Sequence, residues 1–280
     1  MKDLGYYNGK YDLLENMTVP MNDRVCYFGD GVYDVTYCRN YVPYCFDAHI
    51  DRFFSSAKLI DIEIPMTKEE LKALLIDLIK KVDSPEQMMY WQVTRCTAMR
   101  QHDFPKGKQA NIWVTLRPLT VKDMSNPVTL ITAEDIRYQM CNIKTLNLIP
   151  NCLAEEKAKA AGATSAVFHR GDRVTECAHS NIHIIKNGTI ITPPTDELIL
   201  PGIGRANIIR LSKELGIPVE IRPFTVKEMF DADEVMMSSS TAFCMRVSHI
   251  DGKEVGFKDP GTILKLQAAL KKDYEDATRA

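Results

Sequence analysis

Two-residue turns between strand-forming segments recur in this chain, and they constrain its fold more than any other feature. Asn8-Gly9, Gly171-Asp172 and Asn187-Gly188 each separate segments rich in β-branched or aromatic residues. Such pairs adopt the positive φ angles of tight hairpins, in which neighbouring strands run antiparallel. We therefore expect antiparallel sheet near the N-terminus and again in the second half of the chain.

Helical patterns alternate with these strands. Thr67 and Thr225 are each followed three residues later by glutamate, the spacing of a helix-starting capping box. Apolar residues then recur at helical spacing after Thr67. Further helices are expected over residues 48–60, 153–161, 205–215 and 262–274. The predicted fold class is α/β, with mixed α and β elements.

The polar stretch 118–127 resembles an interdomain linker. A chain of 280 residues is long enough for one large domain or two smaller ones. We therefore predict a smaller N-terminal α/β domain over residues 1–119 and a larger C-terminal domain over residues 120–280.

Charge and cysteine content narrow the class of function. The chain has 35 Lys+Arg and 37 Asp+Glu, without the basic excess of nucleic-acid or anionic-membrane binding proteins. No window approaches the ~20 apolar residues of a membrane span. The eight cysteines form no Cys-x-x-Cys pair, so we expect reduced thiols, no metal site and a cytoplasmic protein. Together with the charge balance, this favours a protein that acts on small molecules.

Five separated segments of the chain contain short motifs: Phe28-Gly29-Asp30-Gly31-Val32-Tyr33-Asp34, His49-Ile50-Asp51-Arg52, Asn142-Ile143-Lys144-Thr145-Leu146-Asn147, Val174-Thr175-Glu176 and Leu200-Pro201-Gly202-Ile203-Gly204-Arg205. In this order they resemble the fold type IV pyridoxal phosphate enzymes of the branched-chain aminotransferase-like superfamily. A further pattern, Arg100-Gln101-His102, is similar to the substrate-carboxylate motif of the D-amino-acid transaminases. The resemblance implies the two-domain fold type IV aminotransferase architecture. It also implies amino transfer from a D-amino acid such as D-alanine to a 2-oxo acid such as 2-oxoglutarate.

The resemblance assigns the cofactor chemistry to three residues. Lys144 would form the Schiff base (aldimine) with pyridoxal 5'-phosphate and then move the proton as general base and acid. Glu176 would stabilise the protonated pyridine nitrogen, which lets the ring accept electrons. Leu200 would pack behind the ring, although a structural leucine fits equally well.

The resemblance assigns the cofactor phosphate to glycine and serine turns. Ile203 and Gly204 precede a predicted helix, whose free backbone amides and dipole favour an anion. Arg52 would add a charged hydrogen bond, and Ser239 and Ser240 would add amides and hydroxyls. Taken alone, Arg52 is better explained by a surface salt bridge and the serines by a polar turn.

Recognition of the substrate α-carboxylate falls to Tyr33, Arg100 and His102 by the same resemblance. Arginine offers a forked donor for a carboxylate, and histidine and tyrosine add further donors. In the related enzymes, the arginine and histidine reach the neighbouring subunit's site. The expected assembly is therefore a homodimer with shared active sites.

Some residues depart from the family pattern, and two other reactions remain open. Gly204 stands where threonine is common, and Cys177-Ala178-His179 replaces a serine-rich run. Arg246 is a candidate for a second substrate carboxylate, although a salt bridge explains it better. The alternatives are a branched-chain L-amino-acid aminotransferase and an aminodeoxychorismate lyase.

Overall fold

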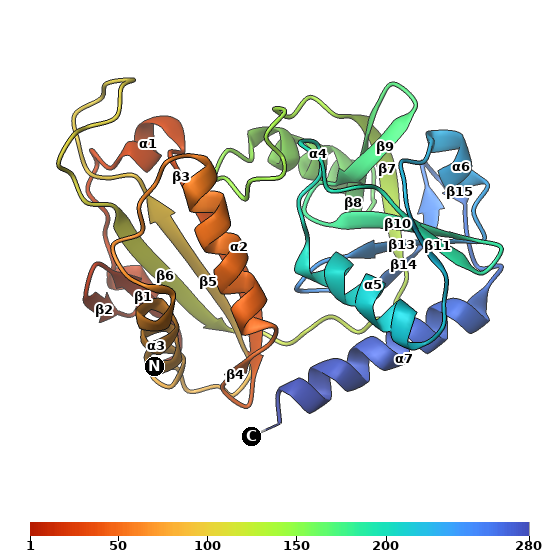
Figure 1. Ribbon diagram of the computed structural model, residues 1–280, viewed down its shortest axis with the longest axis horizontal. Coiled ribbons are helices and arrows are strands. Elements are labelled where there is room, and N and C mark those ends of the chain that lie inside the picture. The colour runs from red at the N-terminus through yellow and green to blue at the C-terminus, as the bar shows by residue number, and fades with distance from the viewer. Residues whose placement is uncertain (280) are drawn as a thin grey trace. The chain divides into compact units, whose positions relative to one another are not determined.

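The computed structural model describes residues 1–279 and divides the chain into two compact units (Figure 1). The first comprises Met1–Val121, the short segment Ile143–Asn147 and the residues from Asp276. The second comprises Lys122–Asn142 and Leu148–Glu275. Both units contain helices and β-sheet, which confirms the α/β class. The first unit thus ends its main range at Val121, and the later segment Ile143–Asn147 also belongs to it.

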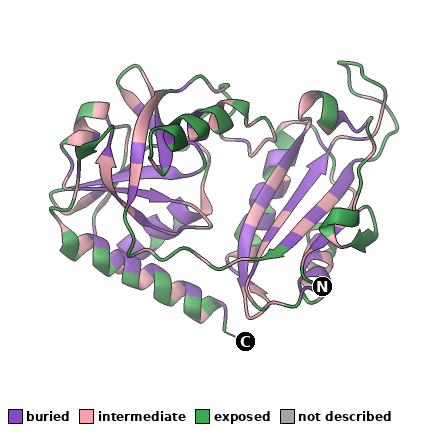
Figure 2. Cartoon of the chain, turned by 180° about the vertical axis from the view of Figure 1, so that it is seen from behind, coloured by how far each residue is buried: buried purple, intermediate pink, exposed green. Residues whose placement is uncertain are grey.

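An antiparallel sheet forms the framework of the first unit. Within residues 1–279 its order is β2 (Lys10–Asp12), β1 (Leu4–Tyr7), β6 (Asn111–Pro118), β5 (Gln87–Thr94), β3 (Gly31–Arg39) and β4 (Val42–Pro43). β3 and β5 pair over eight residue positions, with Tyr33 opposite Gln92. Along much of both strands, buried positions alternate with half-buried ones, so the two faces of the sheet differ (Figure 2).

Two helices, α2 (Phe46–Leu59) and α3 (Lys68–Ile79), bury their apolar faces against this sheet. Phe53 of α2 and Leu71 of α3 share a buried cluster with Trp91 of β5. The predicted capping box is confirmed: Thr67 Oγ1 accepts from the Glu70 N–H at 3.2 Å, and the Glu70 carboxylate accepts from the Thr67 N–H at 2.7 Å. The shorter helical elements are η1 (Leu14–Asn16) and α1 (Arg24–Phe28).

The second unit contains a mixed sheet. Within residues 1–279 its order is β12 (Val219–Ile221), β11 (Thr189–Thr192), β10 (Asn181–Lys186), β13 (Glu234–Ser238), β14 (Met245–Ile250), β7 (Val128–Glu134), β8 (Ser165–Arg170) and β9 (Arg173–Cys177). β15 (Lys253–Glu254) pairs with β14. β7 runs parallel to both β14 and β8, whereas β10 and β13 are antiparallel. β10 and β13 position the residues discussed below.

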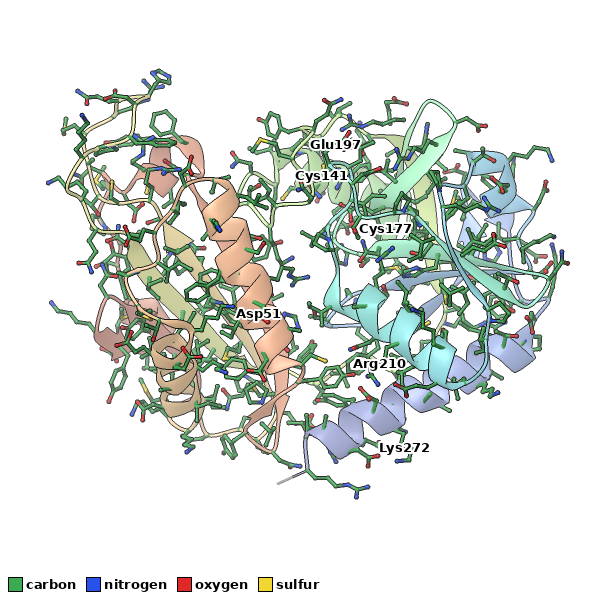
Figure 3. All side chains as sticks on the ribbon, viewed as in Figure 1. Asp51, Cys141, Cys177, Glu197, Arg210 and Lys272 are labelled. Atoms are coloured by element: carbon green, nitrogen blue, oxygen red, sulfur yellow. The ribbon has the colours of Figure 1, made fainter. Side chains whose placement is uncertain are left out.

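Four helices of the second unit lie within the described residues: α4 (Ile149–Ala160), α5 (Ile203–Glu214), α6 (Val226–Phe230) and α7 (Pro260–Ala277), whose last two residues are assigned to the first unit. α5 and α7 bury Ile208 and Leu266 in one apolar cluster with Met236 of β13. Figure 3 labels Arg210 on α5, which donates to Asp273 of α7 at 2.8 Å. Among residues 1–279, no helix is both long and apolar enough to cross a membrane.

The hairpin turns confirm the sequence prediction. Asn8 and Gly9 have φ angles of 44° and 93°, and Asn187 and Gly188 have angles of 49° and 72°. Both residues of each pair thus adopt the left-handed region that this turn requires. β1–β2 and β10–β11 are the resulting antiparallel pairs.

Candidate active site

Lys144 lies in a short segment that pairs with the start of β3. Tyr33 donates its backbone N–H to the Lys144 carbonyl oxygen at 3.0 Å, and Leu146 donates to the Gly31 carbonyl oxygen at 3.1 Å. A β-carbon on Gly31 would lie 2.4 Å from the Val93 carbonyl oxygen, so glycine is required for this close approach. The pairing fixes the backbone of Lys144 beside Tyr33.

The half-buried Lys144 side chain contacts an aromatic surface. Its Nζ lies 4.3 Å from the centroid of the Tyr33 ring, within the range of a cation-π interaction. Tyr33 stacks on Tyr90 with ring centroids 5.4 Å apart. The Lys144 backbone N–H donates to Ser56 Oγ at 3.3 Å. Two residues expected from the sequence, Lys144 and Tyr33, are therefore in contact.

Arg52 makes a forked ion pair with Asp34. Its Nε and Nη2 donate to the two Asp34 carboxylate oxygens at 2.9 and 2.7 Å, and His49 Nδ1 lies 2.7 Å from Oδ1. Burial alone would raise the pKa of Asp34, but Arg52 and His49 outweigh it and hold the pKa well below its usual range. Sequence reasoning missed Asp34, although a carboxylate between Val32 and Thr36 on the buried face of a strand is a detectable signal.

His49 connects Arg52 electrostatically to Lys144. Burial lowers the pKa of His49, Asp34 opposes this, and the positive charges of Arg52 and Lys144 lower it further. Both cations therefore act on the same imidazole. Arg52, Tyr33 and Lys144, three of the residues expected from the sequence, all belong to the first unit.

Arg100 and His102 project from the exposed loop between β5 and β6. Arg100 Cζ lies 5.2 Å, and the His102 ring centroid 5.6 Å, from the centroid of Phe28. The buried Arg24 donates to the backbone carbonyl oxygens on either side of His102, at 2.6 and 3.3 Å. The loop thus has a fixed backbone around two exposed donor side chains.

Asp30 holds this arrangement together. It accepts hydrogen bonds from Arg24 Nε at 2.7 Å and from Arg95 Nε at 2.9 Å. Arg95 also lies over the Phe104 ring at 3.5 Å. Sequence reasoning missed both arginines, because their common partner becomes apparent only when β3 and β5 pair.

Glu176 is buried at the end of β9 in the second unit. Its Oε2 accepts from Asn181 Nδ2 and from the Leu200 N–H, each at 3.1 Å. Its Oε1 pairs with Arg137 Nη1. Leu200, an expected site residue, is therefore joined to Glu176 through its backbone.

Arg137 also binds Asp135, with Nε and Nη2 donating at 2.9 and 2.8 Å. Burial disfavours both charges, yet the pairing lowers the pKa of Asp135, and Asp135 and Glu176 together raise that of Arg137. Sequence reasoning missed Arg137. A signal for it is present in the sequence, because Asp135 and Arg137 closely follow the apolar and β-branched segment 128–132.

The start of α5 approaches the serine turn closely. A β-carbon on Gly204 would lie 3.1 Å from the Ser239 carbonyl oxygen, and one on Gly202 would lie 1.9 Å from Asn181 Oδ1. Gly202 is the N-cap and has no side chain with which to cap the first amides of the helix. Ile203, Gly204 and Ser239 are therefore next to one another in the second unit.

The serine turn continues β13. Ser239 Oγ lies 3.1 Å from Thr241 Oγ1 and accepts from the Thr241 N–H at 3.3 Å. The Ser239 carbonyl oxygen accepts from the Phe243 N–H at 2.9 Å. Ser239 and Ser240 are both half-buried. The turn presents backbone and hydroxyl groups in a compact loop.

Three departures from the family pattern have structural explanations. Arg246 binds the buried Glu234 at 2.7 and 3.1 Å, so an internal ion pair occupies the residue considered for a second carboxylate. His179 is exposed, 3.3 Å from Glu155. Burial raises the pKa of Cys177, whose side chain belongs to the core of the second unit. Figure 3 labels Cys177 at the end of β9.

The chemistry of these residues fits pyridoxal 5'-phosphate. Lys144 offers a half-buried amine, Glu176 a buried carboxylate, and the start of α5 offers amides that lie against the serine turn because Gly204 has no β-carbon. An anion at such a helix start is favoured by the amides and the dipole. Within residues 1–279, no group of three or more His, Cys, Asp or Glu could hold a metal ion.

Comparison with known proteins identifies related sequences. Residues 31–250 match the family model described as amino-transferase class IV. The D-alanine aminotransferase of Listeria monocytogenes serotype 4b (strain F2365) is 42% identical over 254 residues, which cover 89% of this chain and 88% of that protein. The sequence similarity therefore extends over nearly the whole chain.

Solved structures share the fold. The branched-chain amino acid aminotransferase of Escherichia coli has a TM-score of 0.90 at 23% identity, covering 100% of this chain and 97% of that one. The branched-chain aminotransferase of the thermophilic archaeon Thermoproteus uzoniensis, solved with norvaline, has a TM-score of 0.88 at 21% identity, covering 97% and 95%. At these low sequence identities, the structural similarity shows that the fold is shared.

Proposed function

Because this chain belongs to the class IV aminotransferases, we propose that it transfers the amino group of a D-amino acid, such as D-alanine, to a 2-oxo acid, such as 2-oxoglutarate. The observation that carries the proposal is the 42% identity to a D-alanine aminotransferase over 89% of the chain. The fixed loop that presents Arg100 and His102 supports it, since this pair resembles the carboxylate motif of D-amino-acid transaminases.

The cofactor is pyridoxal 5'-phosphate, which when bound holds the amino group between the two half-reactions and accepts the electron pair of the α-carbon. Lys144 Nζ would hold it covalently, and Glu176 would face its ring nitrogen, with Leu200 behind the ring. The backbone of Ile203 and Gly204 would bind its phosphate. Arg52, Ser239 and Ser240 would add donors to the same group.

Lys144 also moves the proton in this proposal. Its Nζ takes the proton from the substrate α-carbon and later returns one. The Tyr33 ring, 4.3 Å from Nζ, limits the positions that the flexible side chain can adopt. Arg100, His102 and Tyr33 hold the α-carboxylate, so that the α-hydrogen of one enantiomer faces the amine.

Glu176 contributes a fixed negative charge. The Arg137 ion pair and the donors from Asn181 and Leu200 hold both of its carboxylate oxygens in place. A carboxylate with fixed donors need not reorganise when a cationic ring nitrogen binds. Glu176 would therefore stabilise a proton on that nitrogen without itself becoming the acid of the reaction.

We further propose that the enzyme is a homodimer in which Arg100 and His102 of one subunit bind the carboxylate of the substrate that reacts at Lys144 of the other subunit. Their exposure in one chain supports this, as do the exposed apolar residues Ile136 and Tyr138. Mixing a Lys144→Ala protein with an Arg100→Ala protein tests it. After random subunit exchange of equal amounts, half of the dimers are mixed and each mixed dimer has one intact shared site, so shared sites predict recovery of about a quarter of the wild-type activity. Sites built within one chain predict no recovery.

A cytoplasmic location also remains our proposal. Among the described residues all eight cysteines are free, and Cys26 and Cys152 are exposed. An oxidising compartment would favour their pairing. Thiol alkylation before cell lysis, read by mass spectrometry, tests this.

Parallel amino-transfer assays test the proposed function. Purified protein saturated with pyridoxal phosphate is given 2-oxoglutarate and either D-alanine or L-leucine. Turnover with D-alanine alone is expected. Turnover with L-leucine alone would make it a branched-chain aminotransferase, and pyruvate release from aminodeoxychorismate without amino transfer would make it a lyase.

A further inference from the structure

A buried chain of hydrogen bonds joins the two elements proposed to bind phosphate. Arg205 Nε donates to Thr192 Oγ1 at 3.1 Å, and His183 Nδ1 lies 2.9 Å from the same oxygen. His183 Nε2 lies 2.8 Å from Ser238 Oγ. All four side chains are buried. Arg205 belongs to the first turn of α5, and Ser238 directly precedes Ser239, so the chain runs from one element to the other.

The cation at one end sets the direction of these hydrogen bonds. Arg205 can only donate, so Thr192 Oγ1 accepts from it and keeps one lone pair and its own hydrogen for the contact with His183 Nδ1. The positive guanidinium disfavours a proton on Nδ1, so the favoured tautomer of His183 has its proton on Nε2 and donates it to Ser238 Oγ. Each bond polarises the next in the same direction, whereas a proton on Nδ1 would point towards the cation.

The His183 ring is neutral in this arrangement. It has no exposed surface, and burial, together with the nearby Arg205 charge, lowers its pKa to about 3. The two ring nitrogens contact the hydroxyl groups of Thr192 and Ser238. Besides burial, the Arg205 guanidinium is the charged group that lowers the pKa of His183. One stable tautomer therefore connects β10 to both neighbouring elements.

The start of α5 and the serine turn after β13 are packed so closely that neither can move far towards the other. A β-carbon on Gly204 would already lie 3.1 to 3.3 Å from the backbone of Ser239. Hydrogen bonds weaken steeply when donors move by a few tenths of an ångström or lose alignment. A shift of β13 against α5 would therefore misplace the amides and hydroxyls aimed at a phosphate.

We propose that His183 is a positioning residue for the phosphate site, where its neutral, Nε2-protonated ring holds Ser238 in register with the start of α5. The ligand class is a phosphate monoester, and the inference rests on the proposed function, which places the cofactor phosphate at Ile203, Gly204 and Ser239. His183 itself does not touch the phosphate. It acts through Ser238 on one side and through Thr192 and Arg205 on the other.

Calorimetric binding to the apoprotein tests the proposal. The His183→Phe side chain fills similar space but makes no side-chain hydrogen bond. Thr192→Val removes the two hydrogen bonds of the Thr192 hydroxyl, to Arg205 and to His183. Each is expected to weaken binding of inorganic phosphate and of pyridoxal phosphate roughly five- to tenfold. Binding of pyridoxal, which lacks phosphate, should not change, and the double variant should bind as the single ones do. Ser212→Ala is the matched control, because this buried serine of α5 has no partner for its Oγ.

A spectroscopic measurement on the wild type does not depend on any variant folding. The ¹⁵N spectrum should show a His183 ring protonated on Nε2 and unchanged from pH 7 to pH 5. A proton on Nδ1, or unchanged phosphate affinity in folded variants, would overturn the positioning role. Failure of phosphate to compete with pyridoxal phosphate in the wild type would instead refute the proposed phosphate site, and the role of His183 with it.

Discussion

Arg137 forms a buried ion pair with Glu176 and binds Asp135 through two further hydrogen bonds. The Arg137 guanidinium thus forms ion pairs with two carboxylates, those of Asp135 and Glu176. Only Glu176 is proposed to face the cofactor. The arrangement fixes the position of the Glu176 carboxylate. With the cofactor bound as proposed, the charge facing its ring nitrogen would depend on Arg137, a residue of a neighbouring loop.

Replacing Arg137 by glutamine should leave two buried carboxylates without their cation. We expect the free energy of unfolding to fall by about 3 kcal/mol, as for other broken buried ion pairs. In the folded holoenzyme, kcat should fall more than KM rises, because ring electronics rather than substrate contact is affected. Chemical denaturation and steady-state kinetics measure both effects. Arg137→Lys retains the charge and should recover part of kcat, and equal activity of all three proteins would contradict the role of Arg137.

Lys144→Ala should abolish the absorbance band of covalently bound cofactor and reduce turnover to background, since both attachment and proton transfer are assigned to Nζ. Absorbance spectroscopy and the D-alanine assay measure this. Borohydride treatment of the wild type should attach the cofactor to the peptide containing Lys144. Lys157→Ala, which removes an exposed lysine of α4, is the control. A Lys144→Ala protein that retained the band would exclude the assignment.

Arg100→Ala should raise KM for both amino and oxo acids roughly tenfold to a hundredfold, the loss expected for a charged hydrogen bond. Arg24→Met should act in the same direction but less strongly, because it removes the donors that fix the loop backbone and leaves the proposed substrate contacts in place. Kinetics with D-alanine and 2-oxoglutarate test both. If Arg24→Met lowered kcat with no change in KM, the loop would not be a substrate clamp.

The pH dependence of stability should reflect His183. Its pKa is about 3 in the folded state, against about 6.5 in an unfolded chain, so the unfolded state binds this proton more readily. The stability contribution of the neutral ring is present above about pH 6.5 and is lost as pH falls towards 3. Relative to His183→Phe, the wild type should lose about 2 kcal/mol between about pH 6.5 and pH 5. Urea unfolding of both proteins measures this, and parallel pH profiles would contradict it.

Features determined by local chemistry could be predicted from the sequence. The Thr67 and Thr225 capping boxes and the Asn8-Gly9 turn depend on residues within a few positions of each other, and all three are confirmed. The start of α4 was missed by four residues, at Ile149 rather than residue 153, because Pro150 in the first turn favours an earlier start.

Contacts between distant segments could not be predicted in this way. Asp34 pairs with Arg52 from a different element, and Arg137 meets Glu176 only after β7, β8 and β9 assemble. Family resemblance pointed to Lys144 and Glu176 but gave no information on the residues that hold them. The pairing of Lys144 with β3 likewise required the fold, because the chain returns to the first unit for only a few residues.

The amino-donating half-reaction tests the central claim most directly. Holoenzyme without any oxo acid is mixed with D-alanine or with L-alanine, and the bound-cofactor absorbance and released pyruvate are followed. We predict that D-alanine removes the band with one pyruvate per subunit, that 2-oxoglutarate restores it, and that L-alanine leaves it unchanged. Loss of the band with L-alanine but not with D-alanine would contradict the proposed D-amino-acid transamination.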